Sequence, residues 1–205
     1  MTTKYDFSNV RGQLIEDLKG AYPTNWEDFR SANILGEDVF GSPRPHPNAV
    51  LNLFETQNIR FATPFAAYRA SIGGFSSLAS EKSGTVLPRH TLATTLHGMH
   101  VFRSLASRAA RRVACGGDLW VCPDKKCALS VGIDPANQRM EALEKVYNAI
   151  VDEPKEGGIL SSPSLGHLLC GTCAEHVGGA YVTWLPIGWK ILPVVFGVSG
   201  GWDDV

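Results

Sequence analysis

The feature that most constrains the fold is a set of four cysteines arranged as two close pairs. Four residues separate Cys122 from Cys127, and two residues separate Cys170 from Cys173. Both spacings allow two thiolates to grip one tetrahedral zinc ion, while backbone amides of the short loop support the sulfur atoms. Because the pairs lie far apart in the chain, a shared ion would close the intervening segment into one unit. We therefore predict a structural zinc site at these four residues.

The same cysteines allow two other interpretations. They could be buried thiols without a role, since cysteine is a common core residue, although the loop Pro123–Lys126 is too polar for a core segment. A redox CxxC pair is the other alternative, but the residues before Cys170 lack the strand pattern of a thioredoxin-like unit. His167 and His176 lie close enough to replace one cysteine as a ligand, and Cys115 is the spare thiol.

A site closed by four thiolates leaves no coordination position for water, so we expect a structural role for the zinc ion and not a catalytic one. The chain also contains no Walker loop, no GxGxxG fingerprint and no GxSxG elbow. His97 and His100 are three residues apart and could hold a second metal in a hydrolase, but no carboxylate accompanies them. We therefore predict that the protein is not an enzyme.

Charge and hydropathy restrict the partner and the compartment. A net charge of -1 and a pI of about 6.6 give no positive field for a phosphate backbone, which disfavours nucleic acid. The most apolar stretch, 180–198, is interrupted by Pro186, Pro193 and Lys190, so we expect no membrane segment. Five cysteines without a secretory signal are typical of a reducing compartment, the cytoplasm or nucleus.

Apolar residues recur at helical spacing through most of the chain. The longest example starts at Pro88 or Arg89 and runs to about Val113, with apolar residues three or four apart. Further helices are predicted from Asp6 to Gly20, over 47–57, over 64–71, after Asp134, and from near Ser164 through the second cysteine pair. Glycine, proline and serine predict loops at 36–47, 73–85 and 154–163. Only 118–121, pairing near Val131, has the pattern of a strand.

The predicted fold class is therefore mainly α: a helical scaffold with little strand and a small zinc-stabilised region. We divide it into N-terminal helices at 1–35, a loop at 36–47, a helical region at 48–113 and a four-cysteine region at 114–205. Two sets of side chains are candidates for contacts with a partner. The first is a basic face, and the second is a group of tryptophans in which only Trp202 is expected at the surface. The residues are Arg103, Arg108, Arg111 and Arg112, and Trp184, Trp189 and Trp202.

Several short motifs recur in an order and spacing that resemble a known family. They are Lys4-Tyr5 with Val10-Arg11, Tyr22-Pro23-Thr24, Ala49–Leu53, Pro64–Tyr68, Leu87-Pro88, the two cysteine pairs, and Trp189–Pro193 with Phe196-Gly197. Together they resemble the C-terminal region of fungal BTB/POZ domain proteins, in particular those of mushroom-forming fungi. Residues 1–35 are similar to the last helices of the BTB fold, and Thr63 stands where the family has leucine.

The resemblance implies a non-enzymatic protein–protein interaction scaffold, because BTB folds are interaction modules. Some members dimerise, and some recruit cullin-type ubiquitin ligases or transcriptional regulators. A complete BTB domain would carry its strands and dimer-forming helices before Met1, so we expect a truncated paralogue or a start at an internal methionine. The alternative function is a zinc-dependent nucleic-acid-binding or transcription-associated protein, in which the basic face meets phosphates.

Overall fold

The structure is a computed structural model, and it describes residues 7–35, 46–72, 74–79, 86–115, 144–148, 158–160, 165–166, 169–199 and 201–202. These residues are mainly helical and include no strand, which confirms the predicted mainly α class. The strand expected at 118–121 and its partner near Val131 lie outside this set. None of the helices in the described ranges is long and apolar enough to cross a membrane.

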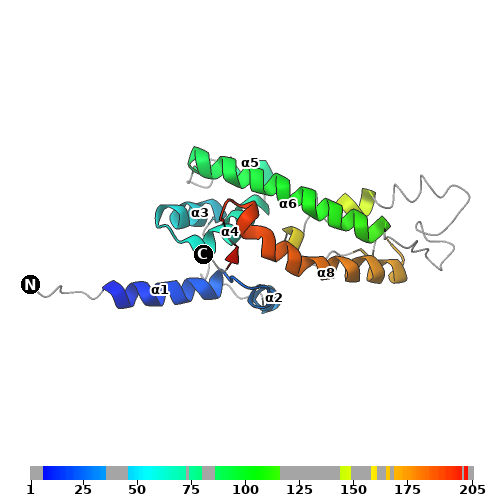
Figure 1. Cartoon of the computed structure of the whole chain (residues 1–205), viewed down its shortest axis with the longest axis horizontal. Coiled ribbons are helices and arrows are strands. Elements are labelled where there is room, and N and C mark those ends of the chain that lie inside the picture. The colour runs from blue at the N-terminus through cyan, green and yellow to red at the C-terminus, as the bar shows by residue number, and fades with distance from the viewer. Residues whose placement is uncertain are drawn as a thin grey trace, which may run out of the picture. The chain divides into compact units, whose positions relative to one another are not determined.

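The elements of the described ranges are helices that follow one another along the chain (Figure 1). In order they are α1 Phe7–Ala21, α2 Trp26–Leu35, α3 Pro47–Thr56, the 3-10 helix η1 Arg60–Ala62, α4 Thr63–Ile72, α5 Gly74–Leu78, α6 Arg89–Cys115, the 3-10 helix η4 Gly158–Leu160, and α8 Gly171–Val195. The chain divides into two units. Unit 1 comprises Met1–Gly98 and Lys190–Val205, and unit 2 comprises Met99–Trp189.

The helices predicted at 6–20, 47–57, 64–71 and 89–113 are confirmed to within one or two residues at each end, and most of the helix predicted after Asp134 lies outside the described residues. Two expectations are wrong. The loop predicted at 73–85 contains α5, because Gly74 takes a φ of 71° that turns the chain out of α4, and Leu78 is then buried at 2% exposure. The last helix starts at Gly171 and not near Ser164, with Cys170 immediately before it.

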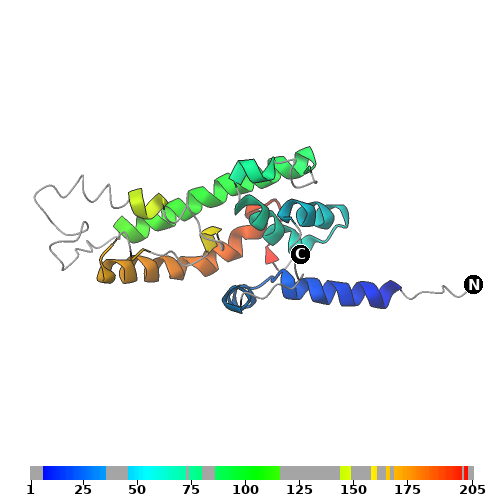
Figure 2. The same ribbon diagram turned by 180° about the vertical axis from the view of Figure 1, so that it is seen from behind.

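Unit 1 has an aromatic core. Tyr22, which follows α1, packs edge-on against Phe54 of α3 at 4.7 Å between ring centroids and against Phe65 of α4 at 5.9 Å. Phe29 of α2 contacts the same Phe65 ring at 5.4 Å. Figures 1 and 2 both show α3 and α4 side by side. Burial raises the pKa of Tyr22 to about 12, and the positive charge of Arg69 opposes this only in part.

The end of α8 packs on the first turns of α6 within unit 1. Gly98 allows the close approach, because a Cβ atom there would lie 2.5 Å from the Phe196 ring. Beyond α8, Gly197 takes a φ of 84°, and the amide of Val198 donates to the Pro193 carbonyl at 2.8 Å. The Gly197 amide donates to the Val194 carbonyl at 3.3 Å, which completes a Schellman cap.

Unit 2 is organised around the buried face of α8. The Trp184 ring packs against Phe102 of α6 at 5.8 Å and against Tyr181 at 5.4 Å. The Tyr181 hydroxyl donates to the carbonyl of Ile159 in η4 at 2.9 Å, in a buried setting. This bond fixes η4 on α8, because a buried carbonyl needs a donor.

Candidate functional site

The second cysteine pair lies at the start of α8. Cys170 precedes the helix and its carbonyl accepts from the Ala174 amide at 2.9 Å, so Cys170 is the N-terminal cap residue. Cys173 follows within the first turn of the helix and is 0% exposed, whereas Cys170 is half-buried. The helix N-terminus carries partial positive charge, which suits negatively charged sulfur ligands of a metal ion. This arrangement can supply half of a tetrahedral zinc site.

The first cysteine pair, Cys122 and Cys127, lies outside the described residues. Within the described ranges, no group of three or more histidine, cysteine, aspartate or glutamate side chains is placed to hold a metal ion. Two of the four predicted ligands are not among the residues that this finding covers. The four-cysteine zinc site therefore stays a prediction.

The candidate histidine ligands and the arginines of the basic face are exposed where their side chains are described, with the exception of Arg103. His176 is exposed one turn beyond Cys173, and His97 and His100 are both exposed on α6. In the predicted basic face, Arg108 and Arg112 are exposed and Arg103 is half-buried. His167 lies outside the described residues.

The tryptophans follow the expected division between core and surface only in part. Trp189 is 2% exposed, which confirms its predicted core position. Trp184 is half-buried, and its ring contacts place it with the aromatic core of unit 2. Trp202, the expected surface residue, is half-buried too.

A second candidate site was not predicted from the sequence. It is a polar cleft of about 690 Å³ in unit 1, lined by Phe54, Glu55, Asn58, Arg60, Thr63, Gly197, Val198 and Ser199. Two helix C-termini form it. Asn58 follows α3 in the same left-handed conformation that Gly197 takes after α8. The φ of Asn58 is 54°, and the amide of the next residue, Ile59, donates to the Phe54 carbonyl at 2.8 Å. Asparagine and glycine are the residues that take this left-handed position most readily.

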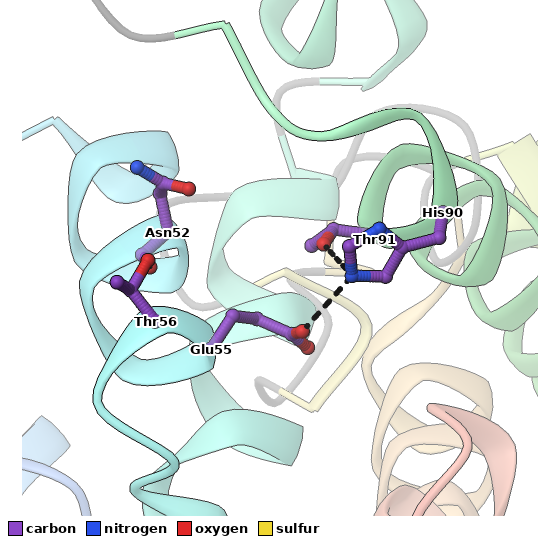
Figure 3. Close-up of polar contacts among 5 residues, drawn as sticks. All are labelled: Asn52, Glu55, Thr56, His90 and Thr91. Atoms are coloured by element: carbon purple, nitrogen blue, oxygen red, sulfur yellow. Dashed lines mark hydrogen bonds and ion pairs between the residues drawn. The ribbon is translucent and has the colours of Figure 1, made fainter.

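The cleft contains one acidic and one basic side chain. Glu55 reaches from α3 toward the start of α6, where its carboxylate lies 3.6 Å from Nε2 of His90 (Figure 3). The Nε of Arg60 donates to the side-chain oxygen of Asn58 at 3.1 Å. Glu55, Asn58 and Arg60 are all exposed, so the cleft is a solvated site and not a buried one.

These observations define the class of protein as a mainly helical chain with a cysteine pair at one helix start and a polar cleft at two helix ends. Comparison of the sequence and fold with protein-family models, with curated proteins and with solved structures finds no match. The resemblance to BTB/POZ proteins stays a prediction from its motifs.

Proposed function

We propose that this protein is a non-enzymatic interaction scaffold of BTB-related type, acting in the cytoplasm or nucleus. In this proposal a structural zinc ion at Cys122, Cys127, Cys170 and Cys173 stabilises the region 114–205. The observation that carries the proposal is the position of the second pair at the start of α8, with Cys170 as the N-terminal cap and Cys173 fully buried in the first turn.

The placement of Cys173 links metal binding to packing. Cys173 begins the buried stripe of α8, which continues through Val177, Tyr181 and Leu185 at intervals of four residues, each at most 4% exposed. A metal ion at the start of this stripe would fix both the position and the rotation of the helix. Zinc binding by small domains contributes about 10–16 kcal/mol, which is comparable to the whole stability of a typical domain. Loss of the ion is therefore expected to unfold the region.

A scaffold also needs surface for a partner. Outside its buried stripe, α8 exposes Val182 at 43% and Ile187 at 57%. These aliphatic side chains offer apolar area that a protein partner can bury. In unit 2 they lie on the same helix that the proposed zinc ion would hold, so metal binding and partner binding are expected to depend on each other.

Metal analysis of the purified chain, with thermal unfolding of the same samples, tests the proposal. We expect one zinc ion per chain and a cooperative loss of helical signal when a strong chelator is added. Cys170→Ser is the decisive variant, because Cys170 is only half-buried and its loss removes little packing. Cys115→Ser is the matched control and should retain the metal.

Two results would contradict the proposal. The first is a zinc-free parent protein that unfolds cooperatively. The second is a Cys170→Ser variant that keeps its zinc ion and its melting temperature. Cys122→Ser separates the two halves of the prediction, because retention of zinc in that variant would show that the distant pairs do not share one ion.

A further inference from the structure

The polar cleft of unit 1 holds two opposite charges that do not neutralise each other. Glu55 and Arg60 both line it, yet in the described part of the chain no ion pair joins them. Arg60 is held by Asn58, whose left-handed backbone fixes the donor–acceptor contact at 3.1 Å. That contact uses only Nε, so the two terminal nitrogens of the guanidinium still face solvent or a ligand.

Glu55 is also only partly engaged. One carboxylate oxygen lies 3.6 Å from His90, and the other has no such contact among the described residues. The carboxylate lies in the last turn of α3, and the C-terminus of α8 reaches the same cleft at Gly197. Both helix ends carry partial negative charge. The Glu55 side of the cleft therefore favours a positive group, and the Arg60 side favours a negative one.

We propose that this cleft binds a small zwitterion of the amino-acid or dipeptide class, with its ammonium at Glu55 and its carboxylate at Arg60. A simple anion would meet the Glu55 carboxylate, and a simple cation would meet the Arg60 guanidinium. Only a ligand with both charges satisfies the two groups at once. Arginine also suits a carboxylate geometrically, because its planar nitrogens can donate two parallel hydrogen bonds.

The size and lining of the cleft agree with such a ligand. Its volume of about 690 Å³ lies within the range of about 300–1,000 Å³ that is typical of small-molecule sites. Val198 is half-buried at the wall and offers a small apolar surface to an aliphatic side chain. Ser199 is exposed beside it and can donate or accept a hydrogen bond. We expect a dissociation constant on the order of 1 mM, because ion pairs between exposed groups are weak.

An NMR titration of the full ¹⁵N-labelled chain with glycyl-valine tests the proposal. We expect saturable shifts of amide signals at Glu55, Asn58, Arg60, Val198 and Ser199. N-acetyl-glycyl-valine lacks the ammonium, and glycyl-valinamide lacks the carboxylate. Each blocked peptide should bind about fivefold more weakly, the factor that corresponds to one exposed ion pair of about 1 kcal/mol.

Variants assign each charge to its partner. Glu55→Gln should weaken glycyl-valine binding about fivefold but should not weaken binding of the acetylated peptide, which has no ammonium for Glu55. Arg60→Gln should weaken glycyl-valine binding about fivefold but should not weaken binding of the amidated peptide, which has no carboxylate for Arg60. Glu16→Gln and Arg30→Gln are matched controls, because both residues are exposed and neither lines the cleft. They should bind as the parent does.

The proposal is overturned if glycyl-valine produces no saturable shifts at the cleft, or if both blocked peptides bind as tightly as the free one. It is also overturned if Glu16→Gln and Arg30→Gln weaken binding as much as the cleft variants do. Because the cleft lies in unit 1 and needs no metal, these outcomes are independent of the zinc measurement.

Discussion

Replacing Gly98 with alanine measures how closely α6 and the end of α8 pack within unit 1. Two effects of opposite sign compete. Inside an exposed helix, alanine in place of glycine stabilises by about 1 kcal/mol. At Gly98, however, the new Cβ would lie 2.5 and 2.7 Å from two atoms of the Phe196 ring and 3.0 Å from the Val195 carbonyl oxygen. Phe196 is 3% exposed, so its ring has little room to move.

Overpacking of a core costs about 1–3 kcal/mol. The clash at Gly98 involves both a buried ring and a backbone atom, so we place its cost at the upper end of that range. After subtraction of the helix-propensity gain, the free energy of unfolding should fall by about 1–2 kcal/mol. For a chain of this length that corresponds to a melting temperature lower by roughly 3–6 °C.

Urea denaturation followed by circular dichroism measures the change, and Gly12→Ala is the matched control. Gly12 lies inside α1 and is exposed, and a Cβ atom added there would meet nothing within 4 Å, so that variant should gain about 0.5–1 kcal/mol. A Phe196→Val background should remove most of the Gly98→Ala penalty, because valine lacks both the Cδ and the Cε atoms that would clash. If Gly98→Ala stabilises as Gly12→Ala does, or costs the same in both backgrounds, the packing argument is refuted.

Two further perturbations follow from buried tyrosines. Tyr181→Phe removes the donor to the Ile159 carbonyl and should cost about 1–3 kcal/mol, because the carbonyl stays buried; denaturant unfolding measures this, and an unchanged midpoint would contradict it. Tyr22 has a pKa of about 12 in the folded state and about 10 in the unfolded chain. The contribution of neutral Tyr22 to the free energy of unfolding should therefore be fully present below pH 10 and be lost as the pH rises from 10 to 12. Unfolding midpoints across that range should decline less in Tyr22→Phe, and an equal decline would contradict the assignment.

The helices could be predicted because their signals are local. Pro47 at the first position of α3 and the apolar spacing along α6 act within one or two turns, and the structure follows both. The error at α5 has a tertiary cause. Gly74 and the neighbouring serines indicate a loop, but Asn48 donates from α3 to the Leu78 carbonyl at 3.3 Å, and the burial of Leu78 stabilises a turn of helix that sequence propensity disfavours.

The two candidate sites differ in how much of each the sequence reveals. The Cys170 and Cys173 pair is visible as a motif, and its place at a helix start could be inferred only to within several residues. The cleft is formed by 54–63 and 197–199, which are far apart in sequence. Asn58 and Gly197 each indicate a helix end on their own. Nothing local shows that these two ends meet, so the cleft required the tertiary structure.

The path of α8 shows the same competition between local and tertiary effects. Pro186 and Pro193 each remove a helical hydrogen bond, and a proline inside a helix costs about 3 kcal/mol. The buried face of the helix carries Tyr181, Leu185, Trp189 and Leu192, none more than 4% exposed, and burial of one such side chain contributes about 1.5–3 kcal/mol. Packing therefore outweighs the prolines, and α8 continues through both. It ends at Val195, where the left-handed Gly197 lets two amides bond back to the last turn and so replaces the helical bonds that are lost.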